Sequence, residues 1–568
     1  MNLCCWKSSK IQLLVLETKR WELEAEIRFH RIHCGVRTNY LTSSRKKQVE
    51  EEAEEESMDT TSAAAAAASE QHRRIHQAAA ASEQHRKIHQ AAAATSSICD
   101  LTEIATKHNP LFWSCEVGSM NLSHRVVLAP LTRCRALDSV PQAAHVEYYT
   151  QRAAVPGGLL ITEANAVGPE AFGLCHTPGI YTEDQVEAWA KVVDAVHAKG
   201  CFIICQLWHV GRASHFCYQP DGAAPVSPTR NAIKRPFLAK LPNGQVDDYS
   251  EPRALATQEI PVIVQQFRRA ARNAIIAGFD GVEVHAAHGY LVDQFLKDGI
   301  NDRIDQYGGS LENRCRFLLE IVEQINAEIG AGRTSVRLSP LMDHNDAVDS
   351  NPADLALYLI KKLNDFKLAY LHVTEPRFHT VLGPAKETDH NLQIYRDAFH
   401  GLFMATGGYT REDGMLAIRR GYADLISYGR LFISNPDLPL RFALNSTLNK
   451  YDRSTFYTHG QRSGYTDYPS LFQLQQQQQY LEEEEEEEAS CHATADHGRF
   501  VRSVTVDHGA QSNTAAAAST KSTISFRRSS SNMISLQDQL LLHQTTSSKP
   551  FELGDVPKSK FKTPAALL

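Results

Sequence analysis

The sequence predicts an α/β protein: a (β/α)8, or TIM, barrel with inserted loops over its C-terminal face, flanked by disordered low-complexity termini. Between residues 107 and 472, eight short and almost continuously apolar runs alternate with amphipathic helical stretches. Such runs are typical of parallel strands that helices cover on the outside. The region is long enough for eight β/α units with additional loops, which favours a closed barrel.

The eight predicted strands are rich in β-branched and aliphatic residues. They cover Val126–Pro130, Leu159–Ala164, Phe202–Trp208, Gly281–His285, Ser335–Pro340, Tyr370–Glu375, Phe403–Gly407 and Leu425–Gly429. Between them, apolar residues at helical spacing predict helices over 184–198, 258–277, 311–329 and 352–365. The longest insertion, 209–256, follows the third strand, and we expect it to form part of a lid or substrate wall over the C-terminal face.

Both termini have a biased composition. Residues 1–106 contain an acidic run, an alanine run and a tandem repeat of 13 residues (69–81 and 82–94), and residues 473–568 contain a glutamine run and the glutamates Glu482 to Glu488. Such segments offer little apolar surface, so we expect both to be disordered. Each repeat carries a His-x-x-x-His pair (His72/His76 and His85/His89). These pairs leave a metal site open, although solvated low-complexity sequence is the simpler interpretation.

The composition favours a reducing compartment. The 12 cysteines show no framework spacing, and a large core needs no disulfide staples. No apolar run is long enough to span a bilayer. We expect a cytoplasmic protein, with organelle targeting by the basic N-terminus as an open alternative. We expect a small-molecule partner rather than nucleic acid or a membrane; the oligomeric state stays unknown, and the net charge of −7 owes much to the acidic runs.

Polar residues or glycines follow nearly every predicted strand, and catalytic residues of such barrels lie at these strand ends. His285, His288 and Tyr290 follow the fourth strand. Two histidines can donate hydrogen bonds to one oxygen, and a phenol beside them can deliver a proton. Reduction of a C=C bond next to a carbonyl requires this combination. The histidines taken alone also fit a metal pair or ordinary capping or core residues, but no third ligand at zinc-protease spacing follows.

A phosphate site is predicted after the last two strands, where Gly407, Gly408 and Gly429 let the backbone approach a ligand and Arg430 supplies a permanent charge. Glycines that only make tight turns are the alternative. The site taken alone suits a sugar phosphate or FMN. No G-x-G-x-x-G follows a strand, so we expect no separate dinucleotide domain.

Motifs spread over residues 109–469 resemble one known family. They include LAPLTRCRA (128–136), QLWHVGRAS (206–214), HAAHGYLVDQFLKD (285–298), TGGYTREDG (406–414) and YGRLFISNPDLPLRF (428–442). In this order they are similar to the old yellow enzyme family, and most of all to its plant 12-oxophytodienoate reductases. Both long termini, Cys134 and the run Asn165-Ala166-Val167 depart from the family pattern.

The resemblance implies an FMN-dependent, NADPH-consuming ene-reductase that acts on α,β-unsaturated carbonyls, such as 12-oxophytodienoate or related cyclopentenones in jasmonate and oxylipin biosynthesis. It implies that Tyr290 is the proton donor, and that substrate is bound by His285, His288, Arg377 and Tyr457. The residues implied to bind FMN are Pro130, Leu131, Thr132, Ala164, Gln206, Arg337, Gly407, Gly408, Gly429 and Arg430. No metal is expected in this site. A flavin barrel enzyme of other specificity, a metal hydrolase and a non-catalytic flavin-binding scaffold stay open as alternatives.

Overall fold

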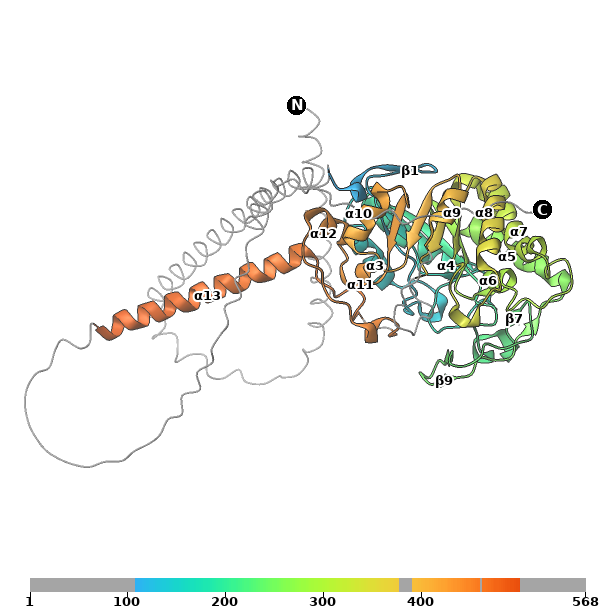
Figure 1. Ribbon diagram of the computed structural model, residues 1–568. Coiled ribbons are helices and arrows are strands. Elements are labelled where there is room, and N and C mark those ends of the chain that lie inside the picture. The colour runs from blue at the N-terminus through green and yellow to red at the C-terminus, as the bar shows by residue number, and fades with distance from the viewer. Residues whose placement is uncertain (1–107, 377–390, 460–461, 501–568) are drawn as a thin grey trace, which may run out of the picture. The chain divides into compact units, whose positions relative to one another are not determined.

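The computed structural model describes residues 108–376, 391–459 and 462–500 (Figure 1). The predicted substrate residue Arg377, the histidine repeats and residues 1–106 therefore lie outside the described residues, as does the tail beyond residue 500. The chain divides into two units with the boundary after Glu482. The barrel belongs to the first of them.

A closed ring of eight parallel strands forms the centre of the first unit. The strands are β3 (Val126–Leu128), β4 (Leu159–Ile161), β6 (Phe202–Trp208), β11 (Gly281–Ala286), β12 (Thr334–Leu338), β13 (Leu371–Thr374), β14 (Phe403–Thr406) and β15 (Leu425–Tyr428). Each pairs with the next in this order, β15 pairs with β3, and the direct pairing of β11 with β6 completes the ring. The short strand β5 (Asn165–Ala166) extends the pairing with β6. All eight predicted strands and the barrel are confirmed.

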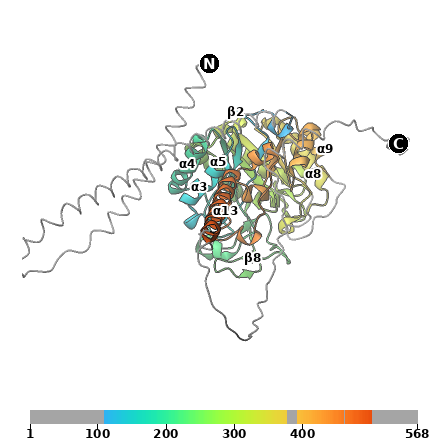
Figure 2. The ribbon, with the colours of Figure 1, turned by 90° about the vertical axis from the view of Figure 1, so that its left-hand side faces the viewer.

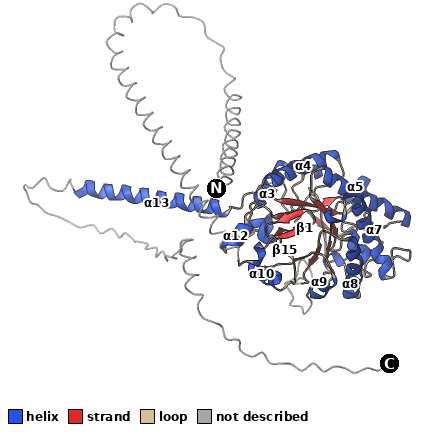
Figure 3. Ribbon diagram, turned by 90° about the horizontal axis from the view of Figure 1, so that it is seen from above, coloured by secondary structure: helices blue, strands red, loops and turns tan. Residues whose placement is uncertain are grey.

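Helices cover the outside of the ring (Figure 3). They are α3 (Ala143–Arg152), α4 (Glu183–Ala198), α5 (Ile260–Ile276), α6 (Leu291–Leu296), α7 (Leu311–Ile329), α8 (Pro352–Leu363), α9 (Gln393–Ala398), α10 (Arg411–Arg419), α11 (Arg430–Ser434) and α12 (Leu438–Leu444). The four helical stretches predicted from periodicity correspond to α4, α5, α7 and α8. Helices α3, α4 and α5 lie side by side along the outside (Figure 2).

Local sequence signals set where these helices begin. In α4, the Thr182 hydroxyl accepts from the Gln185 amide at 3.3 Å, and the Gln185 side chain accepts from the Thr182 amide at 3.1 Å. This reciprocal pair is a capping box, which satisfies two backbone donors that a helix start leaves open. Ser310 caps α7 in the simpler way, through its hydroxyl. Short 3₁₀ turns occur at Pro110–Phe112, Leu137–Ser139, Phe216–Tyr218, Pro220–Gly222, Thr257–Glu259, Ala331–Arg333, His344–Asp346, Asn364–Phe366 and Arg453–Thr455.

A hairpin closes the N-terminal end of the barrel. Strands β1 (Cys115–Val117) and β2 (Met120–Leu122) pair antiparallel. Their inward side chains pack in one buried cluster with residues from the barrel strands, which include Val127, Ile161, Ile204, Tyr370, Met404 and Leu425. This end of the barrel is therefore a buried apolar core. The sequence analysis did not predict the hairpin.

The insertion after β6 contains two small two-stranded sheets. Strand β7 (Val226–Ser227) pairs with β10 (Arg253–Ala254), and β8 (Ala239–Lys240) pairs with β9 (Val246–Asp247). Three of its side chains, Ile233, Phe237 and Tyr249, pack with Trp208 and Tyr290 at the C-terminal end of the strands. The insertion thus forms a wall of the barrel mouth, as predicted.

Beyond the barrel, the structure differs from the expectation of a disordered tail. Residues Leu471–Phe500 form helix α13. Glutamine, glutamate and alanine are good helix formers, which explains why sequence with little apolar surface still forms a helix. Among the described residues, no helix has the length and apolar character needed to cross a bilayer.

Candidate active site at the barrel mouth

The three residues that the sequence analysis singled out lie together. His285 is near the end of β11 and is 5% exposed, and His288 and Tyr290 follow it in the turn before α6. The ring of His285 lies 5.4 Å from that of His288 and 5.1 Å from that of Tyr290, measured between centroids. Two imidazoles and a phenol therefore meet at the C-terminal end of the strands, where barrel active sites are found.

The backbone turn that places them is held from several sides. His288 has a left-handed φ of 59°, and the adjacent Gly289 has φ 73°. A Cβ on Gly289 would lie 2.3 Å from the His344 carbonyl oxygen, so only glycine fits there. The His288 amide donates to Ser339 Oγ at 2.8 Å, and Asn345 Nδ2 donates to the His288 carbonyl at 3.0 Å. The loop after β12 thus supports the loop after β11.

The two histidines are neutral. Burial, and then the positive charge of Arg337, hold the pKa of both His285 and His288 well below the usual histidine value. A neutral imidazole keeps one N–H donor and adds no charge of its own. Nδ1 of His285 is buried and has no partner among the described residues, whereas Nε2 of His288 lies 3.4 Å from Thr374 Oγ1. The site therefore offers neutral donors to a ligand oxygen.

Tyr290 keeps its proton. Burial raises the pKa of its phenol, and the neighbouring Tyr249, Tyr457 and Cys134 raise it further. Its ring also contacts Trp208 edge to face, with 5.0 Å between centroids. A phenol held in its acid form beside two neutral donors is suited to protonate a ligand that gains negative charge.

Several buried histidines outside this cluster allow a prediction about pH. Burial lowers the pKa of His124, His209 and His344 to about 4. The unfolded chain takes up these protons near pH 6.5, so their stabilisation is complete above that pH and is lost as the pH falls toward 4. Burial raises the pKa of Glu163 to about 7, which acts in the opposite direction and offsets about one histidine.

We therefore expect the free energy of unfolding, measured in urea, to fall by more than about 3 kcal/mol between pH 7 and pH 5, because the lowered pKa values of His145, His285 and His288 add to the same fall. The variant His124→Gln should reduce this fall, whereas the same change at the exposed His400 should leave it intact. An equal fall in all three proteins would show that the buried imidazole is not its cause.

The predicted phosphate residues lie side by side. Gly407 and Gly408 follow β14 with φ values of 132° and 84°, and Gly429 precedes α11, in which Arg430 is the first residue. Because β14 and β15 are paired neighbours, these two loops meet. A Cβ on Gly407 would come within 2.7 Å of Glu375 Cβ, and one on Gly429 within 3.2 Å of Leu131 Cδ2. Glycine backbone at two neighbouring strand ends, with Arg430 at the start of the helix that follows, fits a phosphate.

Two polar side chains line the interior on the opposite strands. Gln206 on β6 is 2% exposed and Arg337 on β12 is 8% exposed. Nε of Arg337 is buried without a partner among the described residues. Burial lowers the pKa of Arg337 and Glu283 opposes this shift, but a guanidinium stays charged in either case. The orphaned donors of Arg337 and His285 fit a planar ligand with carbonyl oxygens, such as the flavin ring of FMN.

The loop after β3 joins the site to the C-terminal part of the barrel unit. Pro130, Leu131 and Thr132 follow β3 after one residue, and Ala164 lies buried after β4. The next residues clamp a distant segment: Arg133 Nη2 donates to the Gly464 carbonyl at 2.7 Å, and Arg135 Nη2 donates to Thr458 Oγ1 at 2.7 Å. This segment carries Tyr457, which is 48% exposed and lies on the rim of the mouth.

The structure adds site residues that the sequence analysis missed. His344 lies in the loop after β12, with its ring centroid 6.3 Å from His288 and 6.0 Å from Phe237. Tyr249 and Asn345 also contribute to the environment of Tyr290. The rule that loops after barrel strands carry the site would have pointed to His344 and Asn345. Tyr249 lies in the insertion 209–256 that was expected over the mouth, but nothing in the sequence singled it out. Within the described ranges, no three His, Cys, Asp or Glu side chains gather as a metal site.

Comparisons with known proteins agree with this geometry. Residues 110–449 match the profile of the NADH:flavin oxidoreductase / NADH oxidase family. A relative named 12-oxophytodienoate reductase 7, from Oryza sativa subsp. japonica, is 55% identical over 65% of this chain and 96% of its own length. Another, 12-oxophytodienoate reductase 2 from Arabidopsis thaliana, is 52% identical over 64% of this chain and 96% of its own.

Solved structures show the same barrel. Morphinone reductase superposes with a TM-score of 0.61 at 44% identity, over 64% of this chain and 97% of that one. An old yellow enzyme homologue from Zymomonas mobilis superposes with a TM-score of 0.59 at 39% identity, over 63% of this chain and 99% of that one. The chain therefore belongs to the NADH:flavin oxidoreductase / NADH oxidase family, also called the old yellow enzyme family, and to its plant 12-oxophytodienoate reductase branch.

Proposed function

We propose that this protein reduces the C=C bond of 12-oxophytodienoate or a related cyclopentenone, as a step of oxylipin and jasmonate biosynthesis, and that it does so in the cytoplasm. Its family membership makes it an FMN-dependent oxidoreductase that takes electrons from NAD(P)H and acts on α,β-unsaturated carbonyls. The names of its plant relatives support the choice of substrate. The described cysteines are all free thiols, in line with the proposed compartment.

The FMN would be held by the residues that surround the mouth. We assign its phosphate to the backbone of Gly407, Gly408 and Gly429 and to the guanidinium of Arg430. We assign its ring to Gln206 and Arg337, and its remaining contacts to Pro130, Leu131, Thr132 and Ala164. When bound, this group carries an electron pair from NADPH to the substrate. Arg337 supplies the positive charge that favours the reduced, anionic form of such a ring.

The side chains after β11 carry the substrate chemistry. His285 and His288 would donate to the carbonyl oxygen of the enone and stabilise the negative charge that develops there as hydride reaches the β-carbon. Tyr290 would give its proton to the α-carbon, and solvent would restore that proton. The observation that carries this proposal is the close grouping of two neutral imidazoles and one protonated phenol.

Substrate recognition would extend to the rim. Tyr457 and, from the sequence analysis alone, Arg377 are proposed to line the substrate side. Trp208, Phe237 and His344 add apolar and aromatic surface next to Tyr290 and His288. Such a surface suits a ring with a hydrocarbon chain better than a small polar enone.

The test uses the full-length protein. It should be yellow as purified or after addition of FMN, lose its colour with NADPH without oxygen, and regain it with 12-oxophytodienoate or 2-cyclohexenone. We expect the cyclopentenone to give the higher kcat/KM. If the reduced protein regains its yellow colour with 2-cyclohexenone but not with 12-oxophytodienoate, the proposed substrate is wrong. If it binds FMN but regains its colour with neither enone, the proposed reaction is wrong.

A further inference from the structure

Four buried polar side chains form a continuous hydrogen-bonded chain across the interior of the barrel. Gln206 Nε2 donates to Glu283 Oε1 at 2.7 Å, Glu283 Oε2 lies 2.9 Å from His372 Nδ1, and His372 Nε2 lies 2.8 Å from Ser427 Oγ. None of the four is more than 2% exposed. The residues come from β6, β11, β13 and β15, so the chain connects strands from different sides of the ring.

This chain lies directly under the proposed flavin site. Glu283 precedes His285 by two residues on β11, and residues two apart on a strand face the same side. Gln206, at one end, is a proposed contact of the flavin ring. Ser427, at the other end, precedes Gly429 of the proposed phosphate loop by two residues. Both ends therefore support cofactor-binding residues.

The chemistry of Glu283 fixes the direction of each hydrogen bond. Burial alone would raise the pKa of this carboxyl, but His372, Arg337 and Gln206 together bring it below its ordinary value, so it is ionised. An ionised carboxylate only accepts hydrogen bonds. The Gln206 atom that faces it must therefore be the amide nitrogen, and the His372 nitrogen that faces it must carry the proton. Burial lowers the pKa of His372, so its other nitrogen accepts from the Ser427 hydroxyl.

The amide of Gln206 is consequently held in one of its two orientations. Its nitrogen is used by Glu283, and no group among the described residues donates to its Oε1. This oxygen is left as an acceptor for an N–H group of a ligand. The pyrimidine edge of a flavin presents an imide N–H between two carbonyls, which an amide oxygen in this orientation can bind.

We propose that Glu283 is a positioning residue for the cofactor, an inference that rests on the proposed FMN site. Glu283 orients Gln206 so that the amide oxygen of Gln206 meets the imide N–H of the flavin. The charge of Glu283 also balances that of Arg337. His372 and Ser427 hold the carboxylate in place. A buried carboxylate is costly unless it is fully hydrogen-bonded, and here both of its oxygens are bonded.

The test compares full-length Glu283→Gln with wild type. Glutamine has nearly the same shape but can face Gln206 with either its oxygen or its nitrogen, and it carries no charge. We expect the Kd for FMN to rise about 10-fold, since an amide turned the wrong way presents a donor to the imide N–H. We also expect the midpoint potential of bound FMN to become more positive, because Arg337 then stabilises the reduced ring without a balancing carboxylate.

Two further variants separate positioning from a general disturbance of the core. Ser335→Ala changes a buried residue whose Cα is paired with that of Glu283 on the next strand but that is not part of the chain. It should keep wild-type FMN affinity and potential. Glu283→Asp retains the charge on a shorter side chain, and should weaken FMN binding while leaving the potential near wild type. If Glu283→Gln fails to fold, the FMN affinity and the midpoint potential of Glu283→Asp decide the test instead.

The proposal is overturned if the folded Glu283 variants match wild type in both quantities, or if Ser335→Ala shifts them as much. Neither quantity depends on an enone. A wild-type protein that binds no FMN would contradict the proposed function instead, so the two failures are distinguishable.

Discussion

Replacing Tyr290 by phenylalanine is expected to slow reduction of the enone by about 100- to 10,000-fold, the range for a positioned proton donor. Reduction of bound FMN by NADPH should proceed as in wild type, since that step takes no proton from the phenol. The raised pKa of Tyr290 keeps the donor protonated throughout the neutral range. Stopped-flow absorbance without oxygen measures the two half-reactions separately.

Tyr395→Phe provides the matched control for this prediction. Tyr395 is a fully buried tyrosine on α9, and its hydroxyl has no partner among the described residues. Its loss should alter neither half-reaction. If Tyr290→Phe slows both half-reactions to the same extent, the assigned role of Tyr290 is wrong.

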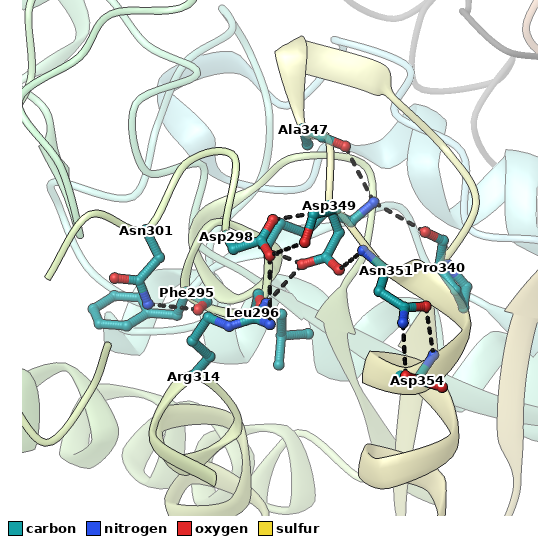
Figure 4. A network of polar contacts seen from close by, with 12 residues as sticks. Phe295, Leu296, Asp298, Asn301, Arg314, Pro340, Ala347, Asp349, Asn351 and Asp354 are labelled. Atoms are coloured by element: carbon teal, nitrogen blue, oxygen red, sulfur yellow. Dashed lines mark hydrogen bonds and ion pairs between the residues drawn. The ribbon is translucent and has the colours of Figure 1, made fainter. Parts of the chain in front are cut away.

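A second large effect is expected at Lys297, whose ammonium holds the loop after β12. The side chain is 1% exposed, and its Nζ donates to the carbonyls of Met342 at 2.7 Å, Ala347 at 3.1 Å and Pro340 at 3.2 Å. Figure 4 shows how the Pro340 and Ala347 carbonyls point toward one nitrogen. Lys297→Met would leave these carbonyls, and Asp293 at 4.0 Å, without their cation.

We expect Lys297→Met to lower the free energy of unfolding by about 3 to 5 kcal/mol, the cost of removing one partner of a buried charge. The loop carries His344 and Asn345, and Asn345 binds the His288 carbonyl. The KM for the enone, measured on the folded fraction of the Lys297→Met variant, should therefore rise. Lys361→Met, an exposed lysine in the last turn of α8, is the control and should change neither quantity. Urea titration gives the free energy of unfolding and steady-state kinetics give the KM. A Lys297→Met variant with wild-type stability and wild-type KM would refute the role of Lys297 in holding this loop.

Aspartates and an arginine reinforce the same loop region. Arg314 Nη1 donates to Asp349 Oδ2 at 2.6 Å (Figure 4). The Ser350 amide donates to Asp298 Oδ1 at 2.8 Å. These contacts join the start of α7 and the segment after α6 to the loop that precedes α8. These contacts fix the C-terminal end of the loop whose earlier residues, Ser339 and Asn345, bind the His288 backbone.

The strands, and the position of the candidate site residues at the strand ends, were predictable from sequence because they are local signals. Runs such as Phe202 to Cys205 are almost wholly apolar and largely buried, and the polar residues that follow such runs fall at the mouth by the geometry of any parallel barrel. The resemblance to a known family supplied the cofactor, which spacing alone left open.

The remaining features depend on contacts between residues far apart in the chain. Glu283 and His372 are 89 residues apart and meet only because the ring closes. Neither stood out in the sequence, since a polar residue inside an apolar strand can face solvent, a neighbour or the core. The hairpin β1–β2 was missed for a similar reason: its strands have three residues each and are stabilised by the barrel end against which they pack.

That hairpin packs against the N-terminal end of the barrel, so we expect ligands to enter at the C-terminal mouth. NADPH, which reduces the flavin, and the enone, which is reduced by it, should therefore pass through the same opening and bind in the same space one after the other. Initial rates should accordingly give parallel lines in double-reciprocal plots when one substrate is varied at fixed levels of the other, and an excess of either should inhibit by excluding its counterpart.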